Sequence, residues 1–161
     1  MRTDLSASTM TSFFAYPGGD AERADPAFLA GATGEEWQIL VREIGAHAFE
    51  AGEDLIAAGD PGDAFYILIE GRVQVVAPAL FGTRIVATIE AGSVFGEIAF
   101  LDGGTRTATV RAITGGTMMR LTRAGLDALQ ERDPALATRI ALDLGRICAA
   151  RLRRTLRLLD R

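Results

Sequence analysis

The amino-acid sequence predicts a mainly β protein, in which a sandwich or barrel of short strands has helices before and after it in the chain. Between about residues 46 and 121, short runs rich in β-branched and aromatic residues recur about every eight to twelve residues, with turn residues between them. On both sides of this region, apolar residues recur three or four positions apart, which is the spacing of an amphipathic helix. The 161 residues are 48% apolar and 24% charged, so we expect one soluble globular domain.

The chain before the strands predicts a tail and two helices. Residues 1–25 are rich in Ser, Thr, Gly and Asp, and we expect them to form a loosely ordered tail. The stretch 25–29, whose second residue is proline, predicts a short capped helix. Thr33 and Glu36 have the spacing of a capping box, which predicts the start of a longer helix that ends at Gly45.

The strands are predicted from apolar runs that Gly, Pro and Asp punctuate. The run 65–69 contains only apolar and aromatic residues, which indicates a buried strand. Gly115-Gly116 predicts a hairpin turn between the last two strands. The predicted strands lie at 55–56, 65–69, 73–76, 84–89, 107–113 and 117–121.

The segment 95–110 differs from the other strand connections because it places polar side chains around a short apolar run. Gly96-Glu97 comes first, and the apolar residues 98–101 that follow are long enough for about one helical turn. Asp102-Gly103-Gly104 breaks this turn, and Arg106 then opens the next predicted strand.

The residue types in this segment fit a small anionic ligand that carries a sugar. The N-terminus of a short helix presents unpaired backbone N–H groups that attract phosphate, and Gly96 allows a ligand close to the backbone. Arg106 offers a planar pair of donors to a phosphate group. Glu97 is a poor partner for phosphate but accepts hydrogen bonds from sugar hydroxyls. Thr107 offers a hydroxyl to the phosphate or to a base edge.

The segment Gly96-Glu97-Ile98-Ala99, with Arg106-Thr107-Ala108 beginning nine residues after the glutamate, resembles the phosphate-binding cassette of the cyclic nucleotide-binding domain family. That family includes the bacterial catabolite activator and the regulatory subunits of protein kinase A. The resemblance covers roughly residues 27–159 and implies an eight-stranded jelly-roll β-barrel with flanking helices. It also implies that Arg106 binds the cyclic phosphate and that Glu97 binds the ribose 2′-hydroxyl.

The resemblance implies a receptor for cyclic AMP or cyclic GMP over residues 26–161, and no catalytic activity. Related domains with threonine directly after the phosphate-binding arginine often accept cyclic GMP, so Thr107 leaves both nucleotides open, and a cyclic dinucleotide is an alternative. Thr105 departs from the family pattern, because many members have proline there. The only histidine, His47, is too few for a metal cluster, and no nucleophile elbow is present, so we expect no metal, catalytic residue or cofactor.

Two helices are predicted after the strands. Thr122 caps the first, over residues 123–131, and Asp133-Pro134 caps the second, which continues to about Leu159. We expect the front half of the second helix to cover the barrel mouth and the back half to pair with the same helix of a second copy, giving a homodimer. Its apolar stripe consists of Leu136, Ile140, Leu144, Ile147 or Cys148, Leu152, Leu156 and Leu159.

The remaining features bear on partners and location. No DNA-reading helix-turn-helix follows the long helix before Arg161, so we expect signalling to an unidentified effector protein. Cys148 is the only cysteine, which makes a reducing cytoplasm the simplest setting, and no apolar run approaches the ~20 residues of a membrane span. Two alternatives stay open: a ligand-free docking scaffold with a Glu97–Arg106 ion pair, and nucleic-acid binding through the arginine-rich end of the last helix.

Overall fold

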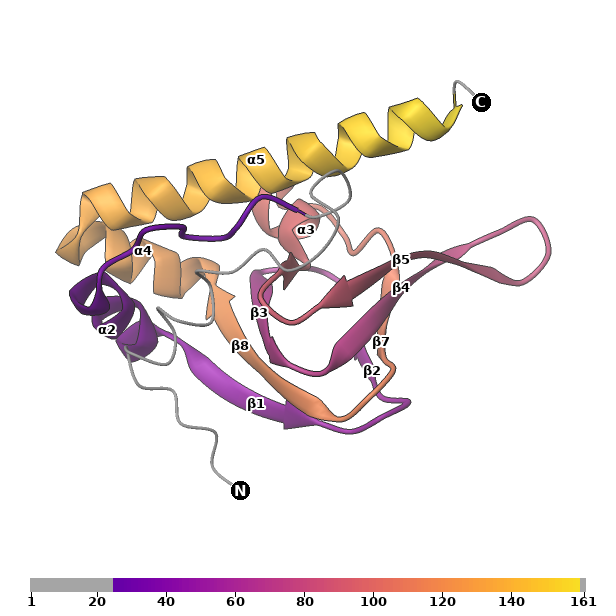
Figure 1. The fold of residues 1–161 in the computed structure, drawn as a ribbon, viewed down its shortest axis with the longest axis horizontal. Coiled ribbons are helices and arrows are strands. Elements are labelled where there is room, and N and C mark those ends of the chain that lie inside the picture. Colours follow the sequence, from indigo (N-terminus) through magenta and orange to yellow (C-terminus); the bar gives the residue numbers. More distant parts are fainter. Residues whose placement is uncertain (1–24, 160–161) are drawn as a thin grey trace. The chain divides into compact units, whose positions relative to one another are not determined.

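The computed structural model describes residues 25–159, and these residues form two compact units (Figure 1). Ile44 to Gly125 form a β unit, and the residues up to Glu43 together with those from Leu126 onward form a helical unit. The tail predicted over residues 1–25 lies outside the described residues, apart from Asp25.

The β unit contains eight strands in two four-stranded sheets, in the orders β1-β8-β3-β6 and β2-β7-β4-β5. All the strand pairs are antiparallel. This arrangement confirms the predicted jelly roll of mainly β structure, although the hydrogen-bonded pairing forms two sheets rather than one closed barrel. The strands are β1 Gly45–Phe49, β2 Asp54–Ile56, β3 Ala64–Glu70, β4 Arg72–Pro78, β5 Thr83–Glu90, β6 Val94–Phe95, β7 Thr109–Ala112 and β8 Gly116–Thr122.

The core of the β unit lies among the inward-facing residues of both sheets. Strand β3 is buried along most of its length, as its uninterrupted apolar sequence predicts, because it lies inside its sheet between β8 and β6. The residues of the core cluster are Phe49, Ile56, Leu68, Val73, Ile89, Phe95, Val110 and Ala112.

The prediction of a hairpin at Gly115-Gly116 is wrong. Strand β7 belongs to one sheet and β8 to the other, so these glycines connect two sheets instead of two paired strands. A Cβ atom on Gly116 would lie 2.0 Å from the backbone oxygen of Glu70. Glycine is therefore needed for the close approach of two backbones as the chain crosses between the sheets.

Strands β4 and β5 form a hairpin that extends beyond the other strands of the unit (Figure 1). At its tip, Leu80 and Phe81 are 97% and 96% exposed. Burial along β5 is confined to Ile89, next to its end, so the tip contributes nothing to the core.

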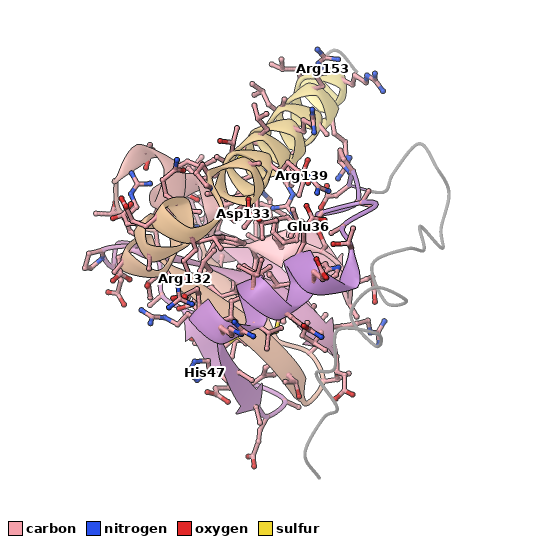
Figure 2. The ribbon with its side chains drawn as sticks, turned by 90° about the vertical axis from the view of Figure 1, so that its left-hand side faces the viewer. Glu36, His47, Arg132, Asp133, Arg139 and Arg153 are labelled. Atoms are coloured by element: carbon pink, nitrogen blue, oxygen red, sulfur yellow. The ribbon has the colours of Figure 1, made fainter. Side chains whose placement is uncertain are left out.

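The helical unit contains α2 (Gly34–Glu43), most of α4 (Arg123–Arg132) and α5 (Pro134–Leu159), and the caps confirm the predicted starts. The Thr33 N–H donates to Glu36 Oε2 at 2.7 Å, and the Glu36 N–H donates to Thr33 Oγ1 at 3.2 Å. The Leu136 N–H donates to Asp133 Oδ1 at 2.9 Å and caps α5. Figure 2 shows Glu36 near Arg139 of α5, and their Oε1 and Nη1 atoms are 2.6 Å apart.

The short helix predicted over residues 25–29 is wrong, because the chain forms a turn at residues 28–31 instead. Leu29 has a positive φ of 51°, and its N–H donates to Asp143 Oδ2 of α5 at 2.8 Å. Phe28 and Leu29 are 0% and 1% exposed. Burial of both side chains and the bond to Asp143 outweigh the local helix signal of Asp25-Pro26.

Burial along α5 changes from its first half to its second. Leu136, Ile140 and Leu144 are fully buried, as is Ile147. Leu152 is 60% exposed and Leu156 51% exposed. The second half therefore presents an apolar stripe to solvent in a single chain. None of the helices in residues 25–159 combines the length and apolar character that a membrane crossing requires.

Candidate ligand-binding site

The predicted site is built on α3, a helix of six residues, Glu97–Asp102, that follows β6. Gly96 precedes it with φ 77°, and Gly103 ends it with φ 71°. The Gly103 N–H donates to the carbonyl of Ala99 at 3.0 Å, which closes the last turn. Both glycines adopt a backbone conformation that L side chains rarely tolerate, so the bounds of α3 follow from glycine placement.

The backbone of Arg106 is fixed by the loop that connects β2 to β3. The Arg106 N–H donates to the carbonyl of Asp60 at 2.7 Å, and the Gly59 N–H donates to the carbonyl of Arg106 at 2.9 Å. Thr105 forms an isolated β-bridge with Pro61. These backbone contacts hold Arg106 in place without a regular strand, which is why β7 begins later than the sequence predicts.

The Arg106 side chain is buried, at 7% exposure, and turns back toward α3. Its Nη1 donates to the carbonyl of Gly96 at 2.8 Å. Its Cζ lies 5.8 Å from the ring centroid of Tyr66, and the Tyr66 ring is stacked on Phe95 with a centroid separation of 5.1 Å. The hydrogen bond to Gly96 uses one of the five N–H groups of the guanidinium, and a planar donor fork of this kind suits an anion.

Two glycines, Gly62 and Gly96, leave room for this guanidinium because they have no side chains. A Cβ atom on Gly62 would lie 2.9 Å from Cζ of Arg106 and 2.5 Å from Cβ of Ala99. A Cβ atom on Gly96 would lie 2.9 Å from Nη1 of Arg106 and 3.0 Å from Cδ1 of Ile56. The arginine can occupy its position only because both residues lack side chains.

The other predicted site residues lie on the same two segments. Glu97 is the first residue of α3 and is 4% exposed, and Ala99 is 2% exposed. Ile98 is 45% exposed, and Thr107 is also exposed. Ala108 is half-buried. Within the described residues, no buried side-chain nitrogen or oxygen lacks a hydrogen-bond partner, so the buried charges of this region are accommodated.

Arg111, the next arginine along the chain, has a different role. Its Nε lies 2.6 Å from Oδ1 of Asp54, and both side chains are 44% exposed. Their hydrogen bond lowers the pKa of the Asp54 carboxyl and raises the pKa of the Arg111 guanidinium. Arg111 thus links β7 to β2 on the surface, and it offers a control for the buried Arg106.

Sequence reasoning missed Gly62 and Tyr66 as parts of this site. Gly62 lies in a run of turn residues, 59–63, and nothing local in the sequence indicates that an arginine 44 positions later passes its Cα. Tyr66 lies within an apolar strand, where an aromatic residue is typical of a core. Residues 25–159 hold no group of three or more His, Cys, Asp or Glu side chains that could bind a metal ion.

Comparison with known proteins relates this chain to one family of domains. A family model described as "Cyclic nucleotide-binding domain" matches residues 46–133, which is more than half of the chain. A crystal structure of a cyclic nucleotide-binding domain from Methylobacillus flagellatus has a TM-score of 0.77 and 24% identity, and the match covers 98% of this chain and 82% of that one. That level of identity supports the fold alone.

Two curated relatives match this chain over more residues than the family model does. The CRP-like cAMP-activated global transcriptional regulator of Mycobacterium tuberculosis is 32% identical over 117 residues, which cover 72% of this chain and 50% of that protein. Glutaminase 1 of Bradyrhizobium diazoefficiens is 33% identical over 131 residues, which cover 81% of this chain and 21% of that protein. The chain thus spans at most half the length of either relative.

Proposed function

Because this chain belongs to the cyclic nucleotide-binding domain family, we propose that it is a receptor for cyclic AMP or cyclic GMP. The observation that carries the proposal is the buried Arg106 guanidinium, which is oriented by its hydrogen bond to Gly96 and faces the start of α3. A guanidinium that the protein has already desolvated and oriented loses little further freedom when it binds a phosphate.

Each site residue has a role in this proposal. Arg106 binds the cyclic phosphate, together with the backbone N–H groups that follow Gly96. The carboxylate of Glu97 accepts a hydrogen bond from the ribose 2′-hydroxyl. Thr107 contributes its hydroxyl to the phosphate or the base edge. The neighbouring Ile98, Ala99 and Ala108 complete the surface that contacts the nucleotide.

We propose further that the chain is a regulatory module and not an enzyme. The matched segment makes up 21% of the related glutaminase, so the similarity leaves most of that protein uncovered. The related M. tuberculosis protein is by its name a cAMP-activated regulator. In this proposal the receptor works in the cytoplasm and signals to an unidentified effector protein through α5, as a homodimer.

Ligand-dependent thermal stability tests the proposal. We expect cyclic AMP or cyclic GMP, at a concentration of 100 times its dissociation constant, to raise Tm by about 5 °C or more. Arg106→Ala removes the phosphate contact and should abolish the rise. Arg111→Ala removes the same charge from the surface ion pair with Asp54, and should keep the full rise.

The two variants separate loss of the site from loss of the fold. Arg106→Ala must still unfold cooperatively in the absence of nucleotide, and Arg106→Lys provides a second variant that keeps the charge. No rise in Tm with either nucleotide at millimolar concentration would count against the proposal, as would an undiminished rise in Arg106→Ala.

A further inference from the structure

Arg106 lies over an aromatic platform that no feature of the cassette sequence predicts. The platform is Tyr66 of β3, whose ring centroid is 5.8 Å from Cζ of Arg106. Phe95 of β6 stacks on the same tyrosine ring with an interplanar angle of 12°. The ring thus contacts both an arginine and a phenylalanine.

The backbone makes this platform rigid. Tyr66 pairs with Phe95 of β6 on one side and with Arg120 of β8 on the other. A residue between two hydrogen-bonded neighbours in a sheet has little freedom to move. The ring is consequently held at a defined height relative to α3, which begins two residues after Phe95.

A buried cation needs compensation for the water it has lost. Arg106 is 7% exposed, and its Nη1 donates to the neutral carbonyl of Gly96. The electron-rich face of an aromatic ring attracts a guanidinium, and this attraction grows as the pair is desolvated. A flat ring also fixes the plane of the flat guanidinium, which a bond at Nη1 alone does not.

We propose that Tyr66 is a positioning residue, which sets the plane of the Arg106 guanidinium so that its remaining N–H groups meet the phosphate of the ligand. This inference rests on the proposed function, because it assigns Tyr66 a part in binding through Arg106. It differs from a purely structural role, in which the ring fills the core and any loss of affinity follows the loss of stability.

Three variants distinguish these roles by titration calorimetry with cyclic AMP and cyclic GMP. Tyr66→Leu removes the ring, and we expect affinity to fall about tenfold. Tyr66→Phe keeps the ring and removes the hydroxyl, and should stay within about threefold of the wild type. Phe49→Leu removes a ring from the same core cluster, and should lower Tm while leaving affinity within about twofold.

Ligand-free stability gives a second measurement. A double-mutant cycle of Tyr66→Leu with Arg106→Lys should reveal coupling between the two side chains, because the lysine does not present a flat group to the ring. Strict additivity of the two changes would overturn the inference.

The possible failures of the two proposals are distinct. If the wild type binds neither nucleotide, both the proposed function and this inference are overturned. If the wild type binds but Tyr66→Leu binds equally well, only this inference is overturned. The same holds if Phe49→Leu weakens binding as much as Tyr66→Leu does.

Discussion

The buried position of the Arg106 side chain depends on two neighbouring glycines. Gly62 and Gly96 have no side chains, and a Cβ atom on either would come within 2.9 Å of the Arg106 guanidinium. Gly96 also needs its positive φ, whereas no such conformation is found at Gly62. For Gly62 the requirement is therefore one of space alone, so a substitution there tests crowding without backbone strain.

We expect Gly62→Ala to weaken nucleotide binding by about tenfold and to lower the free energy of unfolding by about 1–3 kcal/mol. The new Cβ would lie 2.5 Å from Cβ of Ala99, which cannot rotate away, so α3 or the loop must move. Calorimetry and denaturant unfolding measure the two effects. Gly34→Ala is the matched control, because no atom lies within 4 Å of its added Cβ. Unchanged affinity in Gly62→Ala would show that the guanidinium tolerates displacement.

At the scale of elements, the sequence predicts the features whose partners lie within a few residues. It does not predict those whose partners are distant in the chain. The caps at Thr33 and Asp133 were predicted because each capping side chain accepts from a backbone N–H only three residues further along the chain. The turn at 28–31 was missed because its stabilising partner, Asp143, is 114 residues from Leu29 in the chain. The hairpin turn at Gly116 was predicted wrongly for a similar reason, because the backbone that leaves room only for glycine there belongs to Glu70.

The same distinction applies to the candidate site. The cassette residues are consecutive or nearly so, and their residue types indicate phosphate and sugar chemistry without a structure. Gly62 and Tyr66 enter the site only when the loop before β3 and β3 itself are folded beside Arg106. Periodicity within a strand carries no information about which loop passes it.

The capping box of α2 makes a prediction about pH. The Thr33 backbone N–H and, next, Arg139 favour the charged carboxylate and hold the pKa of Glu36 below its usual value. A depressed folded-state pKa stabilises the protein above the unfolded value of about 4.3, and this contribution is lost as pH falls through the lower folded value. Glu36→Gln should therefore lower the free energy of unfolding by about 0.5 kcal/mol at pH 7, and by almost nothing at pH values below the folded-state pKa of Glu36.

Urea unfolding of both proteins at a series of pH values between 7 and the acid limit checks this. Glu35→Gln changes the same charge in the first turn of α2 outside the capping box, and should show a smaller difference from wild type. A gap between Glu36→Gln and wild type that widens on acidification would contradict the assignment.

At the scale of the whole molecule, the proposed homodimer concerns the second half of α5. Leu152 and Leu156 are more than half exposed, while Leu136, Ile140 and Leu144 of the first half are fully buried. A solvent-exposed apolar stripe along about one helical turn is unfavourable in a single chain, and a second copy of the same helix is a symmetric way to cover it.

We expect the wild type to have about twice the 17.1 kDa mass of the chain in light scattering after size exclusion. Leu152→Glu with Leu156→Glu places like charges opposite one another across the proposed twofold seam and should give a monomer. Leu80→Glu is the control, because Leu80 is 97% exposed at the tip of the β4–β5 hairpin, outside α5. A wild-type monomer, or a double variant that stays dimeric, would rule out the α5 seam.

The most direct measurement is titration calorimetry of the full chain and its Arg106→Lys variant with a panel of cyclic AMP, cyclic GMP and cyclic dinucleotides. The account predicts one site per chain for a cyclic mononucleotide, and at least about tenfold weaker binding by the lysine variant, which keeps the charge but loses the flat donor fork. Binding that is indifferent to Arg106→Lys, or binding of a cyclic dinucleotide alone, would contradict it.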